Sequence, residues 1–409
     1  MEVRIPLGAP TQNHNSSLSW FYVILKQMKR ILSNPFLLVL STLVGTIVGA
    51  GIFGLPYVVA KSGIIPGVFY FVFLGGVVMI LHLMFGEIAL RTKEKHRLIG
   101  YASLYLGGWA KKLVTVSTVV GIVGALLAYI IIGGDFLYIV FGSLIPFSSA
   151  TFSVVFWFLL SLFILLGIQA IARIEFFTNV VLFIVVGIIF IFALPHLQAE
   201  NFVFFDSSFL FLPYGVVLFA FLGLSAIPEV AELFKHNSEK RSLDNLIVWS
   251  FIIAGGLYAA FTLFVVGVSG NATSEDALRG LTPFLGEKVV VLGALFGLLA
   301  LADSFLVIGN YLKNSLRYDY RLPYGVSAAA AIFSPIVLFL FGLREFIVVI
   351  GVVGALVAAV EGLVIILIYR TIKEKGDRKP EYSLRIPRPV WIGTAILLVF
   401  GAFLGIFIR

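Results

Sequence analysis

Eleven apolar stretches, separated by polar segments, follow one another along the chain. Hydropathy places them at about residues 35–60, 66–90, 113–135, 151–171, 175–195, 210–234, 246–269, 288–312, 325–342, 346–369 and 389–408. Each comes close to the ~20 apolar residues that an α-helix needs to cross a bilayer. With 60% hydrophobic residues and a mean hydropathy of +1.07, the chain is too apolar for a soluble globular protein. The sequence therefore predicts an all-α integral membrane protein with eleven transmembrane helices.

The positions of Lys and Arg predict how these helices are oriented. If the N-terminus is cytoplasmic, all but five of the 29 Lys and Arg residues lie in the tail or in inside loops, and the exceptions are Lys61, Arg279, Lys288, Arg344 and Arg409. Cytoplasmic loops of membrane proteins carry an excess of these residues. We therefore expect a cytoplasmic N-terminus and an extracytoplasmic C-terminus. Because the cations are spread over several loops, nucleic acid is not an expected partner.

The first apolar stretch contains residues that weaken a helix near its middle. The segment Gly45 to Pro56, GTIVGAGIFGLP, holds four glycines and a proline. Gly costs about 1 kcal/mol relative to Ala inside a helix and Pro about 3 kcal/mol, so we expect the spanning helix to break here. Backbone groups freed at membrane depth are tolerated where they line a cavity or bind a ligand, and N–H groups near Gly51 to Phe53 suit an anion. The alternative is a helix-packing face built on Gly45 and Gly49.

The sixth stretch has a similar pattern. Gly51 and Pro56 are five residues apart in the first stretch, and Gly223 and Pro228 are five residues apart in the sixth. Stretches two to five correspond in position to stretches seven to ten. Because five is an odd number of crossings, the second set must enter the membrane from the opposite side. This organisation predicts a 5+5 inverted repeat with discontinuous first and sixth helices and a binding site at the midplane.

The chain is therefore expected to have four parts. Residues 1–34 would form a cytoplasmic tail with a juxtamembrane helix, 35–195 the first five-helix repeat, 210–369 the second and inverted repeat, and 389–408 an extra eleventh helix. The chain has no cysteine and only five scattered histidines, so neither a disulfide framework nor a transition-metal cluster is expected.

Two segments resemble a known family. GTIVGAGIFGLPYVVAKSG, residues 45–63, is similar to the first helix of the amino acid/auxin permease family and its bacterial aromatic amino-acid permease relatives, within the amino acid–polyamine–organocation superfamily. ADSFLVIGNYL, residues 302–312, is similar to the family's eighth helix. The resemblance implies a LeuT-like fold and secondary transport of amino acids.

By this resemblance, the backbone at the two helix breaks would bind an amino acid. N–H groups around Ala50, Gly51, Ile52 and Phe53 would hold the substrate carboxylate. Carbonyl groups near Thr46 and Ile47, and those from Phe219 to Leu222, would hold its ammonium group.

Four side chains are candidates for contacts with the rest of the substrate. Phe219 and Phe221 flank the second break and form either an aromatic wall or ordinary packing contacts. Tyr129 either reaches the substrate or bonds a neighbouring carbonyl. Ser225 either caps the break or contacts the ligand.

The pair Asp303-Ser304 is the candidate coupling site. The family more often has Thr-Ser there, and in its sodium-coupled relatives those hydroxyls bind the ion together with carbonyls near Gly45 and Val48. The carboxylate of Asp303 would strengthen a Na+ site, carry a proton after desolvation, or form a structural ion pair. We favour the proton, and no cofactor or metal other than Na+ at these residues is expected.

Other ionisable groups in the spans have simpler expected roles. Glu229, Glu232 and Glu361 either relay protons to the cytoplasm or pair with Lys235, Arg173 or a loop cation, and we favour the pairing.

Three more positions complete this set. Glu87 and Arg91 are one helical turn apart and are expected to pair. Asp135 is expected to be solvated, and His82 to be a hydrogen-bonded packing residue.

The sequence thus predicts a symporter that imports neutral, apolar or aromatic, L-amino acids by alternating access, coupled to H+. Alternatives are a Na+-coupled symporter of the same fold and a non-transporting amino-acid sensor or channel. An enzyme is not expected, because the chain has neither facing membrane aspartates nor a Gly-x-Ser-x-Gly motif in a helix. We expect an amino acid and the bilayer as partners, a monomer as the functional unit, and a prokaryotic cell membrane as the location.

Overall fold

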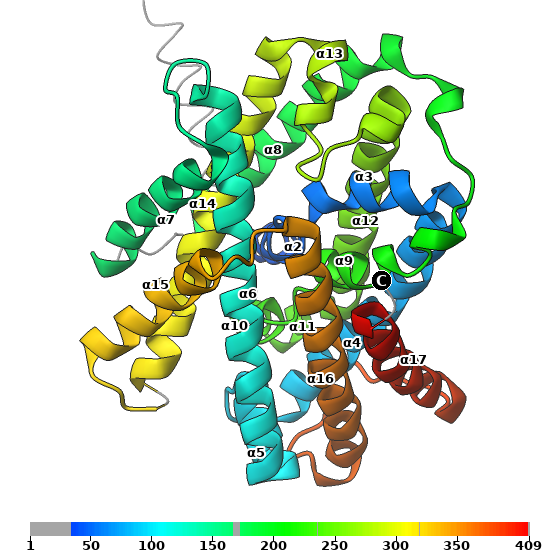
Figure 1. Ribbon diagram of the computed structural model, residues 1–409. Helices are drawn as coiled ribbons and strands as arrows, with labels where there is room; N and C mark the ends of the chain where they lie inside the picture. The colour runs from blue at the N-terminus through cyan, green and yellow to red at the C-terminus, as the bar shows by residue number, and fades with distance from the viewer. Residues whose placement is uncertain (1–33, 167–171, 235, 319, 408–409) are drawn as a thin grey trace, which may run out of the picture.

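The computed structural model describes residues 34–166, 172–234, 236–318 and 320–407, and the regular secondary structure within these ranges is helical throughout (Figure 1). The predicted all-α fold is confirmed. The expected tail and juxtamembrane helix lie, except for Asn34, in residues 1–33, outside the described ranges.

The helices follow the predicted apolar stretches closely. Their bounds are α2 Pro35–Ile47, α3 Gly51–Ser62, α4 Ile64–Arg91, α5 Leu98–Leu106, α6 Gly108–Phe141, α7 Ser149–Leu165, α8 Ala172–Ala193, α9 Leu212–Phe221, α10 Ala226–Leu233, α11 Asn237–Lys240, α12 Leu243–Ser269, α13 Thr282–Leu285, α14 Glu287–Tyr318, α15 Tyr324–Leu340, α16 Phe346–Lys375 and α17 Arg388–Phe407.

Not every helix is long enough to span a membrane by itself. Among the described residues, α4, α6, α12, α14, α16 and the combined α9–α10 segment pass that test, and α2 with α3 forms a seventh span bent by 50°. Four apolar helices, namely α7, the Val180–His196 part of the α8 region, α15 and α17, are shorter. The count of eleven crossings and the inverted repeat therefore stay predictions.

The first helix begins and breaks for local reasons. Asn34 caps α2, its side chain accepting a hydrogen bond from the Phe36 N–H at 3.0 Å, and Pro35 occupies the first helical position. The helix ends at Ile47 and the chain resumes as α3 at Gly51. A break within the Gly45–Pro56 segment is thus confirmed, but it falls at residues 48–50, while Pro56 lies inside α3.

Gly51 brings the two broken helices together. A Cβ atom at Gly51 would lie 2.6 Å from the Cα of Ala220, so only glycine lets α3 approach α9 this closely. The second break spans residues 222–225, between Phe221 at the end of α9 and Ala226 at the start of α10. Both breaks therefore lie side by side at the centre of the bundle, where α16 also packs against α9 and α6.

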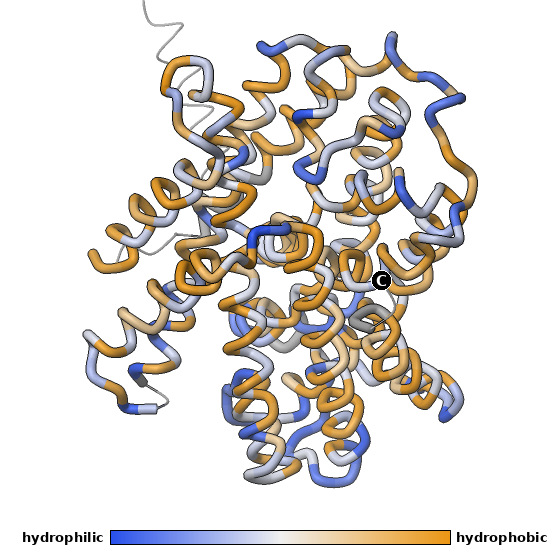
Figure 2. The backbone as a smooth tube through the Cα atoms, in the orientation of Figure 1, coloured by the Kyte–Doolittle hydropathy of each residue, from blue (hydrophilic) through white to orange (hydrophobic). Residues whose placement is uncertain are grey.

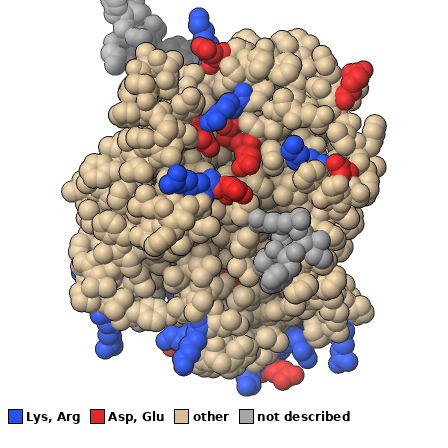
Figure 3. All heavy atoms as spheres, in the orientation of Figure 1, with Lys and Arg blue, Asp and Glu red and all other residues tan. Residues whose placement is uncertain are grey.

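Charged side chains gather at the ends of the molecule. Figure 2 shows hydrophilic residues mainly in the connections between helices, while the helices themselves are largely apolar. Figure 3 shows Lys and Arg projecting from the end near α5, below a broad uncharged band. We call this end, formed by α5, residues 92–97 and residues 376–387, the basic end. Large apolar side chains such as Val72 and Leu340 are exposed on the flanks, as contact with lipid would require.

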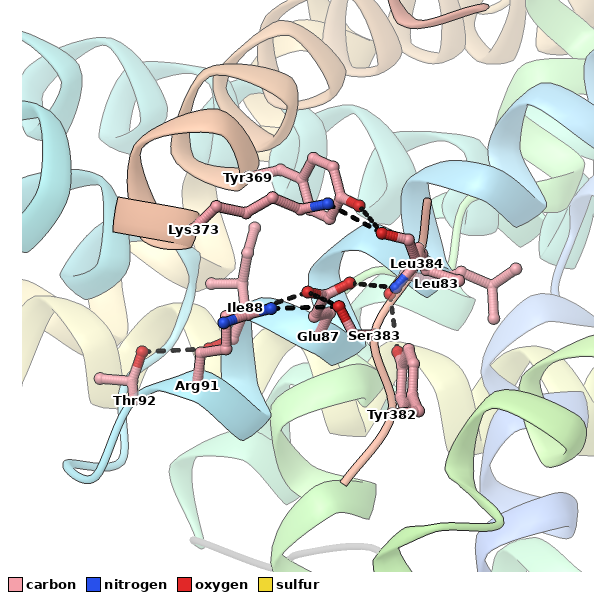
Figure 4. A network of polar contacts seen from close by, with 10 residues as sticks. All are labelled: Leu83, Glu87, Ile88, Arg91, Thr92, Tyr369, Lys373, Tyr382, Ser383 and Leu384. Carbon is pink, nitrogen blue, oxygen red and sulfur yellow. Dashed lines mark hydrogen bonds and ion pairs between the residues drawn. The ribbon is translucent and has the colours of Figure 1, made fainter. Parts of the chain in front are cut away.

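At the basic end, the segment between α16 and α17 is fastened to α4 (Figure 4). Glu87 is fully buried and accepts hydrogen bonds from Arg91 at 2.7 Å, from the Ser383 hydroxyl at 3.0 Å and from the Leu384 N–H at 2.6 Å. The predicted Glu87–Arg91 pair is confirmed. The hydroxyl of Tyr382 donates to the Leu83 carbonyl at 2.6 Å, which holds the same segment against α4.

Candidate functional site

A cavity of about 280 Å³ lies between the two helix breaks and extends toward the basic end. Residues of α2, α3, α5, α6, α9, α10, α14 and α16 line it, together with both breaks. Most of the lining is apolar, with a few polar groups, as in binding sites for small molecules.

Most of the predicted substrate residues meet at this cavity. Its wall includes Thr46, Ile47, Ala50, Gly51, Tyr129, Phe219, Leu222 and Ser225. These residues come from α6 and from the two breaks, which are about 170 positions apart in the chain. The structure thus places the two breaks and Tyr129 around one space.

Three predicted residues point elsewhere. The N–H groups of Ile52 and Phe53 are bonded to the carbonyls of Gly49 and Ala50, at 3.4 and 3.1 Å. By contrast, the N–H groups of Ala50 and Gly51 have no acceptor among the described residues. This break therefore has fewer free backbone N–H groups than the sequence predicted.

The third is Phe221, whose ring packs between helices instead of lining the cavity. It stacks on Phe251 at 5.8 Å and meets the edge of Tyr258 at 5.3 Å. Of the two roles left open for Phe221, the structure shows the packing one. Phe219, two residues earlier, does line the cavity.

Tyr258 on α12 links the two breaks, and the sequence did not single it out. Its side chain is fully buried, and its hydroxyl lies 2.6 Å from the Ile47 carbonyl and 2.8 Å from the Ala220 carbonyl. One hydroxyl has one proton, so it can satisfy only one of these acceptors fully at a time. The Ile47 carbonyl, expected to be free for a ligand, already has a protein donor. A tyrosine inside an apolar span was the available signal.

The predicted coupling residues lie on two segments, α2 with the break that follows it, and α14. Ser304 is a hydrogen-bond partner of Tyr129, but Asp303 is half-buried and has no ion pair among the described residues. Gly45 lies in α2 and Val48 follows it, and α2 packs mainly on α12, α8 and α10 instead of α14. Within the described ranges, no group of three His, Asp or Glu side chains could hold a metal ion.

The mouth of the cavity at the basic end carries charge. Arg97 donates to Glu229 at 3.3 Å, with the two side chains 48% and 54% exposed, and its guanidinium lies 4.3 Å from the ring centre of Tyr311. Glu232 pairs with Lys95 at 3.0 Å. The expected pairing of Glu229 and Glu232 with loop cations is confirmed. The cavity therefore opens toward the basic end.

Glu361 pairs with none of the loop cations that the structure describes. Its carboxylate accepts a hydrogen bond from the Thr118 hydroxyl at 3.1 Å, and none of the ion pairs in the described part of the chain includes it. Lys235 and the side chain of Arg173, named above as alternatives, are outside what the structure describes. Glu361 lines the cavity wall, so an acid with no cation partner among the described residues lies beside the pathway.

The opposite end is closed by packing. Phe53 meets the edges of Phe136 at 4.8 Å and Phe261 at 6.1 Å, just beyond Gly51. The prediction that Asp135 is solvated was wrong. Its carboxylate accepts hydrogen bonds from the Ser149 hydroxyl at 2.5 Å and from Arg279 at 3.1 Å.

His82 has the packing role that was predicted. It is buried, with its Nδ1 2.9 Å from the Val78 carbonyl and its ring against Phe251.

Comparison with known proteins identifies the family. The model of the family "Transmembrane amino acid transporter protein" matches residues 36–372, which is most of the chain. The chain belongs to this family. No curated protein sequence matches it. The crystal structure of the manganese transporter of Eremococcus coleocola, in complex with an aromatic bis-isothiourea substituted compound, is similar with a TM-score of 0.65 and 14% sequence identity, covering 90% of this chain and 86% of that chain.

These findings confirm the resemblance inferred from the sequence and the LeuT-like type of fold that it implies. Family and fold are those of membrane transporters for small molecules, not those of enzymes. The protein is accordingly a membrane amino acid transporter, and its central cavity is the candidate substrate pathway.

Proposed function

We propose that the protein is a symporter that imports neutral, apolar or aromatic, L-amino acids together with H+. The observation that carries this proposal is the cavity between the breaks, which has free N–H groups of Ala50 and Gly51 on its wall and a largely apolar lining. Backbone N–H groups at the start of a helix bind anions, because their dipoles favour negative charge. A substrate carboxylate fits there.

The remaining parts of an amino acid have partners in the same cavity. The ammonium group would meet carbonyls at the breaks, near Thr46 and from Phe219 to Leu222. The side chain would contact Phe219, Ile122 and Val353, which line the cavity. The ionisable groups Arg97, Glu229 and Glu361 of the wall lie on the side of the mouth, so the pocket beside the breaks favours an uncharged side chain.

Alternating access follows from the one-sided opening. The cavity reaches the half-exposed Arg97 at the basic end, while Phe53 packs against Phe136 on the other side of Gly51. We take the basic end as cytoplasmic, since inside loops carry the excess of Lys and Arg. The structure then corresponds to an inward-open state, and rocking of the broken helices would expose the same site outside. We take a monomer as the functional unit.

Coupling to H+ is supported by half-buried acids without cation partners in the described ranges, Asp303 and Glu361. An unpaired carboxylate at membrane depth is expensive unless it takes up a proton. Coupling to Na+ is the second candidate, favoured by the uncommitted carboxylate of Asp303 beside Ser304.

Purified protein in liposomes tests coupling to H+ and coupling to Na+. Uptake of labelled phenylalanine, leucine and alanine would be measured under an imposed pH gradient and, separately, an imposed Na+ gradient. We expect only the pH gradient to drive accumulation. Accumulation with Na+ alone would assign the alternative coupling, and binding without counterflow would indicate a sensor. Absence of both binding and uptake by correctly inserted protein would contradict the substrate class.

A further inference from the structure

Glu361 differs from the other acids at the basic end in what surrounds it. Glu229 and Glu232 pair with Arg97 and Lys95, and both are substantially exposed. Glu361 instead sits in the wall of the cavity, half-buried, with the hydroxyl of Thr118 as its hydrogen-bond donor at 3.1 Å. Glu361 lies on α16 and Thr118 on α6. An acid kept in the pathway without a cation needs a functional or structural explanation.

The position of Glu361 along the pathway separates it from the substrate groups. A Cβ atom at Gly354 would lie 2.6 Å from the backbone nitrogen of Phe219, near the end of α9. On α16, Gly354 therefore lies beside the second break. Glu361 follows seven residues later, or about 10 Å along the helix axis. The carboxylate therefore lies between the breaks and the mouth, too far from Ala50 and Gly51 to belong to the same subsite.

Other charged groups near this stretch have partners of their own. Arg97 stacks on Tyr311 and bonds Glu229, and all three line the same part of the cavity. On the helices packed against α16, Lys111 and Lys112 are exposed and Tyr129 bonds Ser304. Other titratable side chains there are engaged elsewhere: His82 with Val78, Glu87 with Arg91, Tyr214 with Leu397, Tyr105 with Thr92, and Asp135 with Arg279. Tyr101 packs on Phe85 and His96, and Tyr57 lies near Lys61 at the opposite end. On α16 itself, Arg370 stacks on Trp391, and Tyr369 and Lys373 bond the Leu384 carbonyl.

We propose that Glu361, held by Thr118, is the site that carries the coupling proton. This inference rests on the proposed function and assigns its proton to a residue other than Asp303. In the outward-facing state the carboxylate would take a proton from external water, forming a carboxyl O–H bond. In the inward-open state that bond would break and the proton would leave to water at the mouth. There Arg97 favours the ionised form electrostatically, and Thr118 donates to it.

The site has a consequence for the transport cycle. A neutral Glu361 can be enclosed with substrate when the mouth is closed, whereas an ionised one is costly to enclose unless Arg97 compensates its charge. The loaded carrier therefore encloses Glu361 in its protonated form, and the empty carrier returns with Glu361 ionised beside Arg97, which couples substrate movement to the pH gradient. Replacing Glu361 with a neutral isostere should permit closure without the proton.

The experiment compares wild type with Glu361→Gln in proteoliposomes, using labelled phenylalanine, leucine and alanine. Three quantities are measured: accumulation driven by a pH gradient, counterflow exchange at equal pH, and proton influx reported by a trapped pH dye. We expect Glu361→Gln to lose substrate-dependent proton influx and to accumulate at least tenfold less substrate, while counterflow continues. Glu374→Gln is the matched control, because Glu374 is exposed near the end of the same helix, outside the cavity.

Thr118→Val provides a second variant that keeps the carboxylate. Loss of the hydroxyl removes a donor that stabilises the ionised form, so the midpoint of the pH profile of uptake should move to higher pH. A purely structural role of Glu361 would leave this midpoint unchanged. An unmoved midpoint, with counterflow retained, would contradict the proposal.

The outcomes separate this inference from the function on which it rests. Wild type without counterflow or uptake would overturn the proposed function. Wild type with proton influx, together with Glu361→Gln showing the same influx and accumulation, would overturn only the assignment of Glu361. If Asp303→Asn loses proton influx and Glu361→Gln does not, Asp303 carries the proton and the proposal is wrong.

Discussion

The two helix breaks line the same cavity but are built differently. At the first, α2 and α3 meet at 50°, and the N–H groups of Ala50 and Gly51 are left without acceptors in the described part of the chain. At the second, α9 and α10 together still read as one apolar crossing, Leu212–Leu233, interrupted by residues 222–225. The first break therefore offers donors and a change of direction, and the second offers an opposing wall.

Tight packing joins these unlike breaks. Gly51 of the first touches Ala220 of the second, and Tyr258 bonds a carbonyl from each. A movement of one break must therefore be transmitted to the other. The donors of the first break are therefore positioned by the backbone of the second, and mutations can test this dependence.

The largest expected effect comes from Gly51→Val. Its Cβ would lie 2.6 Å from the backbone of Ala220, which cannot be relieved by rotating a side chain. We expect uptake to fall about 100-fold, the effect that a displacement of about 1 Å can have on positioned groups. Proteoliposome uptake measures it. Gly76→Ala on α4 is the control, since nothing lies within 4 Å of a Cβ there. Normal uptake by Gly51→Val would show that the breaks need no close contact.

The two phenylalanines of the second break should respond differently. Phe221 is buried in packing, and its replacement by Ala should destabilise the protein by about 3–5 kcal/mol, as for other buried aromatic residues. Phe219→Ala enlarges the cavity and should change the preference among phenylalanine, leucine and alanine in uptake competition, with a smaller loss of stability. Equal changes in preference for both variants would contradict the separate roles of wall and packing.

Tyr258→Phe tests the bond between the breaks. Removing the hydroxyl takes a donor from the carbonyls of Ile47 and Ala220, of which Ile47 keeps only the Gly49 N–H at 3.0 Å, and a loss of about 1–3 kcal/mol in stability is expected. If those carbonyls also hold the substrate ammonium, saturating amino acid should raise the Tm of the variant more than that of wild type.

Tyr382→Phe is the matched change outside the cavity, since its hydroxyl donates to the Leu83 carbonyl. Its substrate-induced Tm shift should equal that of wild type. An equal shift in Tyr258→Phe as well would argue that the ammonium binds elsewhere.

Hydropathy was enough to place the helices, because a helix that crosses a membrane needs about 20 mostly apolar residues in a row. The break between Gly45 and Pro56 was also predictable from residues that weaken helices. Its exact position was not, because Pro56 is accommodated inside α3 while residues 48–50 leave the helix. Local helix propensity shows which region of the helix is weak, and packing against α9 determines at which residues the helix breaks.

The site could be predicted only in part, because the sequence does not specify how each helix is rotated about its own axis. Asp303 and Glu361 are alike as acids in apolar helices, and the sequence does not say which face of each helix meets the cavity. The Thr118–Glu361 and Tyr258–Ile47 contacts join positions 243 and 211 residues apart. Such contacts depend on how helices are rotated against one another, which single-sequence patterns do not specify.

The smallest expected effect concerns Glu275, far from both breaks in the segment after α12. Burial raises the pKa of its carboxyl above the ordinary value of 4.5, so the folded protein favours the protonated form. The associated stabilisation is complete below about pH 4.5 and is lost as pH rises through the folded-state pKa. Glu275→Gln should therefore have a slightly higher Tm than wild type at neutral pH, and the difference should vanish below about pH 4.5.

Thermal unfolding of the purified protein between pH 4 and 7.5 measures this difference, with Glu200→Gln, an exposed neighbour at the same end, as the control. Since Glu275 does not line the cavity, substrate affinity should stay unchanged across the series. A change in affinity would mean that the closed end is coupled to the breaks, and the two breaks could then no longer be treated as the only parts that position the ligand. A lower Tm at neutral pH would instead show that the ionised carboxylate is stabilised in the fold.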